Sequence, residues 1–311
     1  SLQVTVAVLI ALVLYLIHIN RNCLMKPTDL DKRPKLLPRD TIETFTDEDV
    51  TLDDIYITIK TGSQFHLSRI TYIMNTWFDL VKDQAYIFTD WSDKDLNLTA
   101  NGHLVNTQCG AGKGYEQLGC KMGTEFDAFV DSGKKWWCRF DDDNYVIPAR
   151  LLHLVRSYNS SSDVYIGRLT ASFFHCIYHG KYYRYQFAHG GAGCCITRPL
   201  ALKMRPWCGR TKLVKTQMET QMNDDCALGF IITALLKVDI TLSDLLHSHY
   251  EDLSLLNPNT FTEQVALAWG RDNVVDLKHL KTPAKIFDIQ QDPSRFYTLH
   301  CMVYPSADFC K

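Results

Sequence analysis

Short apolar segments alternate with amphipathic ones from residue 55 onward. The segments richest in β-branched and aromatic residues predict buried strands, and they are Ile55–Lys60, Ala85–Thr89 and Trp136–Phe140. Apolar residues at helical spacing predict helices over His66–Phe78 and Met122–Val130, with a further helix from Pro148 through Leu154. Strands that alternate with helices indicate an α/β domain built around a largely parallel sheet.

Three later segments add shorter apolar stretches, at residues 163–167, 193–197 and 239–249. They favour a Rossmann-like mixed sheet flanked by helices over a purely parallel sheet. In open sheets of this class, ligands bind beyond the carboxyl ends of the strands. Asp90 and the triplet Asp141–Asp143 both fall at that edge. The edge is therefore the predicted ligand site.

The chain opens with an apolar stretch, Leu2–Ile19, that contains no charged residue. It approaches the roughly 20 apolar residues that cross a bilayer, so residues 1–19 are predicted to be a transmembrane signal anchor. A cleaved signal peptide is the competing interpretation, although no small-residue cleavage pattern follows the stretch. Residues 20–50 are polar and contain three prolines. They are predicted to be a stem ahead of a lumenal catalytic domain at residues 51–311.

Composition narrows the class of protein. A hydrophobic fraction of 46% over 311 residues describes a globular chain, and a net charge of -2 without any basic run argues against nucleic acid as a partner. The 11 cysteines include no C-x-x-C pair, which favours disulfides in an oxidising compartment over a zinc site. Asn97 and Asn159 begin N-glycosylation sequons. Together with the anchor, these features predict a type II protein of the secretory pathway.

The strongest chemical signal is the run Asp141, Asp142 and Asp143 at the end of a bulky apolar strand. Three crowded carboxylates repel one another unless a cation compensates, and hard divalent ions prefer oxygen ligands. If strand geometry persists, Asp141 and Asp143 point to one face and Asp142 to the other. The alternative is a solvated turn in which Asn144 caps the next helix. The residues of this run leave both interpretations open.

Three downstream patterns bear on that choice. A glycine loop at Gly190, Gly191 and Gly193 would let the backbone approach a ligand closely, although such a loop is more often only a turn. Asp224 and Asp225 open a helix that continues through Leu236, and either of them could simply cap it. His247 and His249 end another apolar strand, where both imidazoles are predicted to share one face. Imidazole beside carboxylate is a plausible manganese site.

The order of several longer stretches resembles that of a known family. The stretches IKTGSQFH, YIFTDW, WWCRFDDDNYV, DVYIGR, GGAGCC, NDDCALG, LLHSHYEDL and QQDPSRFYTLHCMVYPSADFC occur in the order typical of Fringe-type β-1,3-N-acetylglucosaminyltransferases. The resemblance covers about Asp53 to Cys310. It implies glycosyltransferase family 31, a GT-A fold and a Golgi membrane location. It also implies UDP-N-acetylglucosamine (UDP-GlcNAc) as donor, Mn²⁺ as cofactor, and O-linked fucose on epidermal-growth-factor-like (EGF-like) repeats of Notch or its ligands as acceptor.

The resemblance assigns roles to residues by motif position. Asp143 and His249 would hold the metal, and Asp225 would be the catalytic base with Asp224 as its neighbour. The nucleotide sugar would be bound by Thr61, Arg69, Asp90, Asp141 and Asp142. Three disulfides are implied, namely Cys109–Cys120, Cys138–Cys195 and Cys301–Cys310. Cys226, which follows the implied base, is predicted to be a free packed cysteine.

The resemblance is weakest between Thr170 and Gln186, where the chain is shorter than Fringe and unlike it. His189 replaces a usual threonine, and Cys194 replaces an aromatic residue. These departures leave donor and acceptor preference open. A β-1,3-galactosyltransferase resembling the core 1 O-glycan enzymes is one alternative, and a catalytically inactive transferase-like glycan-binding protein is another.

Overall fold

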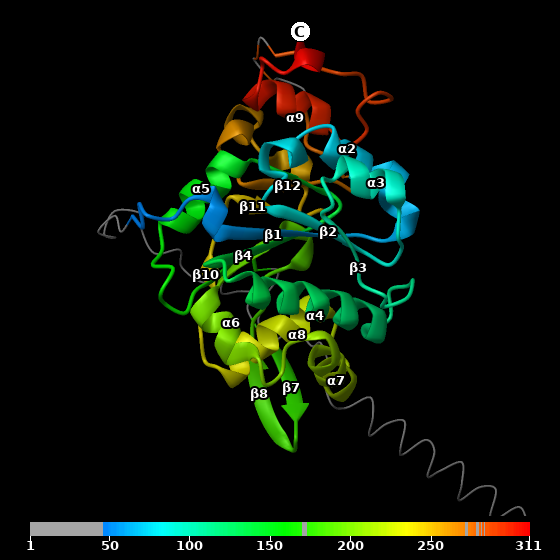
Figure 1. Ribbon diagram of the computed structural model, residues 1–311. Coiled ribbons are helices and arrows are strands. Elements are labelled where there is room, and N and C mark those ends of the chain that lie inside the picture. Colours follow the sequence, from blue (N-terminus) through cyan, green and yellow to red (C-terminus); the bar gives the residue numbers. More distant parts are fainter. Residues whose placement is uncertain (1–45, 170–172, 271–272, 278–279, 281, 283) are drawn as a thin grey trace, which may run out of the picture.

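The computed structural model describes residues 46–169, 173–270, 273–277, 280, 282 and 284–311 (Figure 1). The predicted anchor at residues 1–19 lies outside the described residues, as does the predicted stem up to residue 45. Among the residues that are described, no helix has the length and apolarity that a bilayer crossing requires.

A seven-stranded mixed sheet forms the centre of the domain, in the order β10-β6-β9-β4-β1-β2-β3. Neighbouring strands from β4 to β3 run parallel, whereas β9 is antiparallel to both β4 and β6. The predicted mixed sheet is therefore confirmed. Its strands are β1 (Ile55–Lys60), β2 (Ala85–Thr89), β3 (Leu104–Asn106), β4 (Trp136–Asp141), β6 (Tyr165–Gly167), β9 (Cys194–Thr197) and β10 (Thr241–Leu242).

Alternate residues of the central strands serve two separate cores, one on each face of the sheet. Ile57 of β1 and Phe140 of β4 pack in the first core, whereas Tyr56 and Trp137 pack in the second. Because helices cover both faces, β1 is buried along almost its whole length, as expected of a central parallel strand. Figure 1 shows α2, α3, α5 and α9 on one side of the sheet and α4, α6, α7 and α8 on the other.

The helices match the prediction in part. The predicted helix Met122–Val130 lies within α4, and the helix predicted from Pro148 is α5. The predicted helix His66–Phe78 is wrong as a continuous element: His66–Ile70 is a π-helical turn, and α2 ends at Met74. Thr76 contributes to this ending because its hydroxyl donates to the Tyr72 carbonyl and competes with the backbone ladder. The α-helices are α2 (Thr71–Met74), α3 (Lys94–Thr99), α4 (Tyr115–Ser132), α5 (Pro148–Arg156), α6 (Arg198–Met204), α7 (Arg210–Thr220), α8 (Asp224–Gly229) and α9 (Phe296–Val303).

Two smaller sheets complete the fold. The first has the order β11-β12-β5 and consists of β5 (Asn144–Val146), β11 (Leu246–His247) and β12 (Ala266–Ala268). The second is the hairpin of β7 (Phe174–Tyr178) and β8 (Lys181–Tyr185), which projects from the body of the domain next to α7 (Figure 1). This hairpin occupies most of the segment in which the resemblance is weakest.

All three implied disulfides are present, namely Cys109–Cys120, Cys138–Cys195 and Cys301–Cys310. Cys138 and Cys195 are register partners on β4 and β9, so their bridge links the strand that carries the acidic triplet to the strand that follows the glycine loop. Cys226 is buried and free, as predicted.

Candidate active site

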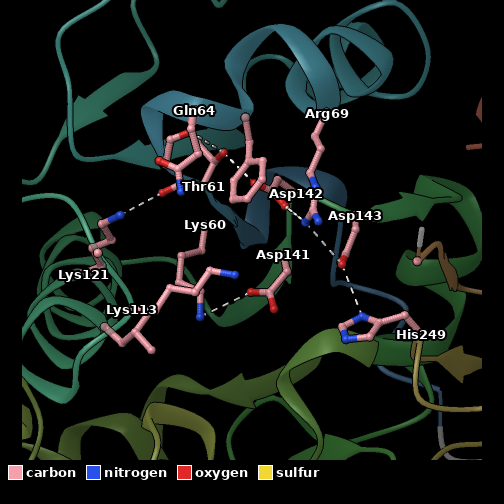
Figure 2. A pocket seen from close by; sticks show the side chains of 15 residues that line it. Lys60, Thr61, Gln64, Arg69, Lys113, Lys121, Asp141, Asp142, Asp143 and His249 are labelled. Carbon is pink, nitrogen blue, oxygen red and sulfur yellow. Dashed lines mark hydrogen bonds and ion pairs between the residues drawn. The ribbon is translucent and has the colours of Figure 1, made fainter. Parts of the chain in front are cut away.

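The site lies at the carboxyl ends of β1 and β4, where the sequence predicted it. These strands are parallel and in register, so Lys60 and Asp141 end side by side. Beyond them is a pocket of about 360 Å³ (Figure 2). Its lining residues are Lys60, Thr61, Gly62, Gln64, Phe65, Arg69, Gly112, Lys113, Leu118, Lys121, Asp141, Asp142, Asp143, His249 and Gly270.

Asp142 is held between two of the residues predicted to bind the nucleotide sugar. Thr61 donates from Oγ1 to Asp142 Oδ2 at 2.7 Å, and Arg69 donates from Nη1 to Oδ1 at 2.6 Å. Burial raises the pKa of Asp142 to about 6, although Arg69 and Thr61 act in the opposite direction. The guanidinium of Arg69 thus sits at the edge of the pocket, where it could also contact an anionic ligand.

The predicted division of the aspartates between two faces is wrong. Asp142 Oδ1 and Asp143 Oδ2 both approach the Arg69 guanidinium, at 2.6 Å and 3.5 Å, whereas Asp141 lies 3.4 Å from Lys60. The strand ends at Asp141 because the Asn144 carboxamide accepts from the Asp141 backbone N–H and turns the chain. Asn144 is therefore not a helix cap. It begins β5, and its Nδ2 donates to the Gly191 carbonyl at 2.9 Å.

Asp143 and His249 meet across the pocket. His249 Nδ1 lies 3.2 Å from Asp143 Oδ2, and this contact raises the pKa of His249 (Figure 2). Asp143 Oδ1 is buried without a hydrogen-bond partner among the described residues. A carboxylate oxygen left unsatisfied beside an imidazole fits a divalent cation such as Mn²⁺.

Two protein ligands do not complete a coordination shell. The described residues contain no group of three or more His, Cys, Asp or Glu side chains placed to hold a metal ion. Cations that work with diphosphates commonly take one or two carboxylates from the protein and their remaining ligands from phosphate and water. The pair of Asp143 and His249 fits that pattern.

His247 does not join this pair, so the prediction that both imidazoles share one face is wrong. His247 is buried, with Nε2 3.0 Å from Gln264 Oε1 and Nδ1 3.2 Å from Glu251 Oε2. Strand β11 ends at His247, and the chain turns before His249. The alternation expected of a strand therefore fails between the two histidines.

The glycine loop separates two functional groups. A Cβ atom at Gly191 would lie 2.8 Å from His249 Cε1, and one at Gly190 would lie 3.3 Å from Asp225 Oδ2. Gly193 has a φ of 80°, and its Cβ would lie 2.4 Å from Phe140. The loop thus needs glycine to bring β9 against β4. It also leaves His249 against one glycine and Asp225 against the next.

Asp225 lies at the start of α8, where two backbone N–H groups orient its carboxylate. Gly190 N donates to Oδ2 at 3.0 Å, and Cys226 N donates to Oδ1 at 2.8 Å. Burial, followed by the charge of Asp224, raises the pKa of Asp225. Asp224 accepts from Lys60 Nζ at 2.7 Å, and this contact lowers the pKa of Asp224 against the opposing effect of burial. The two adjacent carboxylates therefore differ in proton affinity.

Asp90 stands behind the wall of the pocket. Its carboxylate accepts from Lys121 Nζ at 2.7 Å and from Ser63 N at 2.8 Å. These bonds fix the loop that follows β1, and a direct contact of Asp90 with the nucleotide stays a prediction. The three lysines of the lining, Lys60, Lys113 and Lys121, were missed by sequence reasoning. Lys60 could have been found, because it ends β1 as Asp141 ends β4.

The two sequons differ in their surroundings. Asn97 is half-buried within α3, and its Oδ1 accepts from Leu104 N at 3.2 Å. Asn159 is exposed in the turn after α5. Of the two asparagines, Asn159 is the more accessible to a modifying enzyme.

The chain also matches a known protein family over most of its length. The family model described as Fringe-like matches residues 50–307. The chain belongs to the Fringe family. It is 40% identical over 276 residues to the chicken (Gallus gallus) β-1,3-N-acetylglucosaminyltransferase radical fringe. The aligned region covers 85% of this chain and 72% of the relative.

Other members are similarly related. Human (Homo sapiens) manic fringe is 39% identical over 269 residues, or 83% of this chain and 82% of the relative. The Drosophila melanogaster Fringe glycosyltransferase is 40% identical over 268 residues, or 83% of this chain and 64% of the relative. As a Fringe-family member this protein is a glycosyltransferase, and its mixed sheet with flanking helices fits the GT-A fold.

Proposed function

We propose that this Fringe-family protein transfers N-acetylglucosamine from UDP-GlcNAc to O-linked fucose on EGF-like repeats, in β-1,3 linkage with inversion. Membership in a family whose named relatives are β-1,3-N-acetylglucosaminyltransferases supports the donor and the linkage. The modified repeats belong to Notch or its ligands, so the reaction modulates Notch signalling. The chain works as a single-pass type II protein of the Golgi membrane, with its catalytic domain in the lumen.

In this proposal the base is Asp225. Its carboxylate takes the proton from the fucose hydroxyl while that oxygen bonds to the anomeric carbon of the donor sugar, and the bond from that carbon to UDP breaks. The raised pKa of Asp225 suits a base that works near neutral pH. Asp225 is only partly buried, which leaves room for the acceptor hydroxyl to reach it.

The pocket serves the donor. Arg69 and Lys113 place positive charge where the diphosphate would lie, and Thr61 orients Asp142. Asp143 and His249 would hold Mn²⁺, which offsets the negative charge that develops on the departing diphosphate. Phosphate oxygens and water would supply the remaining ligands.

The observation that carries the proposal is the position of the glycine loop between the two groups. Displacement with inversion requires the base and the leaving-group stabiliser on opposite sides of the reacting sugar. Asp225 borders Gly190, and His249 borders Gly191. The adjacent glycines let His249 and Asp225 pack against the loop at separate positions.

The test is a transfer assay with the purified full-length chain, an O-fucosylated EGF-like peptide and a panel of nucleotide sugars. We expect a β-1,3-linked N-acetylglucosamine product with UDP-GlcNAc, loss of activity in EDTA, and recovery on addition of Mn²⁺. Preferred use of UDP-galactose would instead indicate the β-1,3-galactosyltransferase alternative. Acceptor binding without transfer from any donor would refute the proposal.

A further inference from the structure

Lys60 connects the donor pocket to the base, although the sequence analysis gave it no role. It ends β1 and lines the pocket beside Asp141, whose Oδ1 lies 3.4 Å from Lys60 Nζ (Figure 2). The same Nζ donates to Asp224 Oδ2 at 2.7 Å. Lys60 thus bridges β4 and α8, which are separated by more than 80 positions in the chain.

The bridge is buried, which strengthens its effect. The side chains of Lys60 and Asp224 are 13% and 8% exposed. Ion pairs shielded from solvent are screened far less than surface pairs, and removing one partner leaves an uncompensated buried charge. Burial acts to lower the pKa of Lys60, but Asp141 and Asp224 hold it above its usual value, so Lys60 stays charged.

Asp225 depends on this arrangement without touching Lys60. It follows Asp224 directly in α8, and it is not among the described residues that line the pocket. The negative charge of Asp224 favours protonation of Asp225, whereas the positive charge of Lys60 opposes it. The ammonium group therefore both anchors the start of α8 and offsets the charge of the carboxylate next to the base.

We propose that Lys60 is a positioning residue for the transfer reaction, acting through Asp224 to place Asp225 and keep it unprotonated while the donor occupies the pocket. This role rests on the proposed function, because it assigns Asp225 as the base. The contact with Asp141 makes the same ammonium part of the donor pocket, so the two halves of the site share one charged group.

Other charged and titratable groups surround the bridge. Arg139 lies 3.3 Å from Asp141 and 3.9 Å from Glu125 beneath the site. Its charge also lowers the pKa of Asp224, but the ion pair of Asp224 is with Lys60. On the other side of Asp225, His189 is partly buried, and burial lowers its pKa. Buried groups that also face Asp225 are Cys226, Tyr165, Tyr185 and Cys194. These four are neutral near pH 7, since burial raises the pKa of each.

The decisive measurement is the pH dependence of kcat/KM for Lys60→Met, Lys60→Arg and Asp224→Asn in the full-length chain. Loss of the ammonium raises the pKa of Asp225, so the acidic limb of the Lys60→Met profile is expected to move up by about one pH unit. Lys60→Arg keeps the positive charge, so its acidic limb is expected at the same pH as in the wild type. Asp224→Asn removes the competing negative charge and is expected to move the limb down.

The kcat values of the variants provide a second test. Loss of placement is expected to reduce kcat of Lys60→Met by about 10- to 100-fold. If Lys60 acts through Asp224, the same substitution in the Asp224→Asn background costs less than about threefold more. Lys113→Met is the matched control: it removes a positive charge from the same pocket and is expected to leave the acidic limb in place.

Two results would overturn the inference. One is a Lys60→Met enzyme whose whole defect is a higher KM for the donor, with an unmoved acidic limb. The other is an unmoved limb in Asp224→Asn, which tests the same coupling even if Lys60→Met does not fold. Carboxyl ¹³C NMR titration of Asp225 needs no turnover. It therefore tests the charge coupling independently of the proposed transferase activity. That activity is refuted only if the wild-type chain transfers no sugar.

Discussion

Gly191→Ala is the most direct test of the metal pair, because it alters the loop without touching a ligand chemically. The new Cβ would lie 2.8 Å from His249 Cε1 and 3.0 Å from His189 Cε1. An ordinary contact starts at about 3.4 Å, so the His249 ring must retreat by about 0.6 Å. Metal–ligand distances normally lie within about 0.2 Å of their standard values, and changes to residues that orient the ligands typically weaken metal binding by about 10- to 100-fold.

The assay is a Mn²⁺ titration of sugar transfer at saturating donor. We expect the half-saturating Mn²⁺ concentration of Gly191→Ala to rise by about 10- to 100-fold, which corresponds to about 1.4–2.7 kcal/mol. Excess Mn²⁺ should recover part of the rate.

Gly190→Ala is the matched control, because its Cβ meets Asp225 and Arg139 instead of His249. Its rate should fall while its half-saturating Mn²⁺ concentration stays at the wild-type value, and excess Mn²⁺ should not recover the rate. Gly191→Ala with the Mn²⁺ dependence of the wild type would refute the assignment of His249.

Three further predictions concern other parts of the chain. Asp225→Asn should reduce kcat by about 100- to 10,000-fold with little change in donor affinity, and normal transfer by this variant would show that the base lies elsewhere. Burial lowers the pKa of His300 to about 4. The unfolded chain then binds an extra proton below about pH 6.5, so the free energy of unfolding should fall between about pH 6.5 and 4. In urea unfolding, the free energy of unfolding of His300→Gln should change less with pH than that of the wild type. An equal pH dependence in the two proteins would contradict the reasoning. Peptide mass spectrometry of protein from a secretory host should find glycan on Asn159 in preference to Asn97, and the reverse occupancy would contradict the burial argument.

The sequence predicted the scaffold of the site well, because that scaffold follows local patterns. Strands β1, β2 and β4 are strongly apolar and end in polar residues, so both their existence and the position of the site at their carboxyl ends could be predicted. The interrupted helix after His66 could not, because the hydroxyls of Thr71 and Thr76 donate to backbone carbonyls and compete with the helical ladder.

The arrangement within the site was predicted less well, because it depends on contacts between distant segments. Asn144 shapes the acidic turn while it donates to Gly191, a contact that no local pattern contains. The separation of His247 from His249 likewise depends on Gln264 and Glu251. Lys60 was overlooked for a different reason. It lies in the stretch IKTGSQFH, but its role depends on contacts with Asp141 and Asp224, which are distant in the chain.

The order of the central sheet also has a consequence for how the protein folds. β1 pairs with β4 although β2, β3 and the helices α2, α3 and α4 lie between them in the chain, and β4 pairs with β9 through residues 57 positions apart. Sheets built from such distant pairings form slowly, because loop-closure entropy is lost before the contacts exist. The donor pocket sits on the β1–β4 seam, and its His249 lies against the loop that leads into β9. The pocket joins Lys60, Asp143 and His249, so it cannot form until most of the domain has been synthesised.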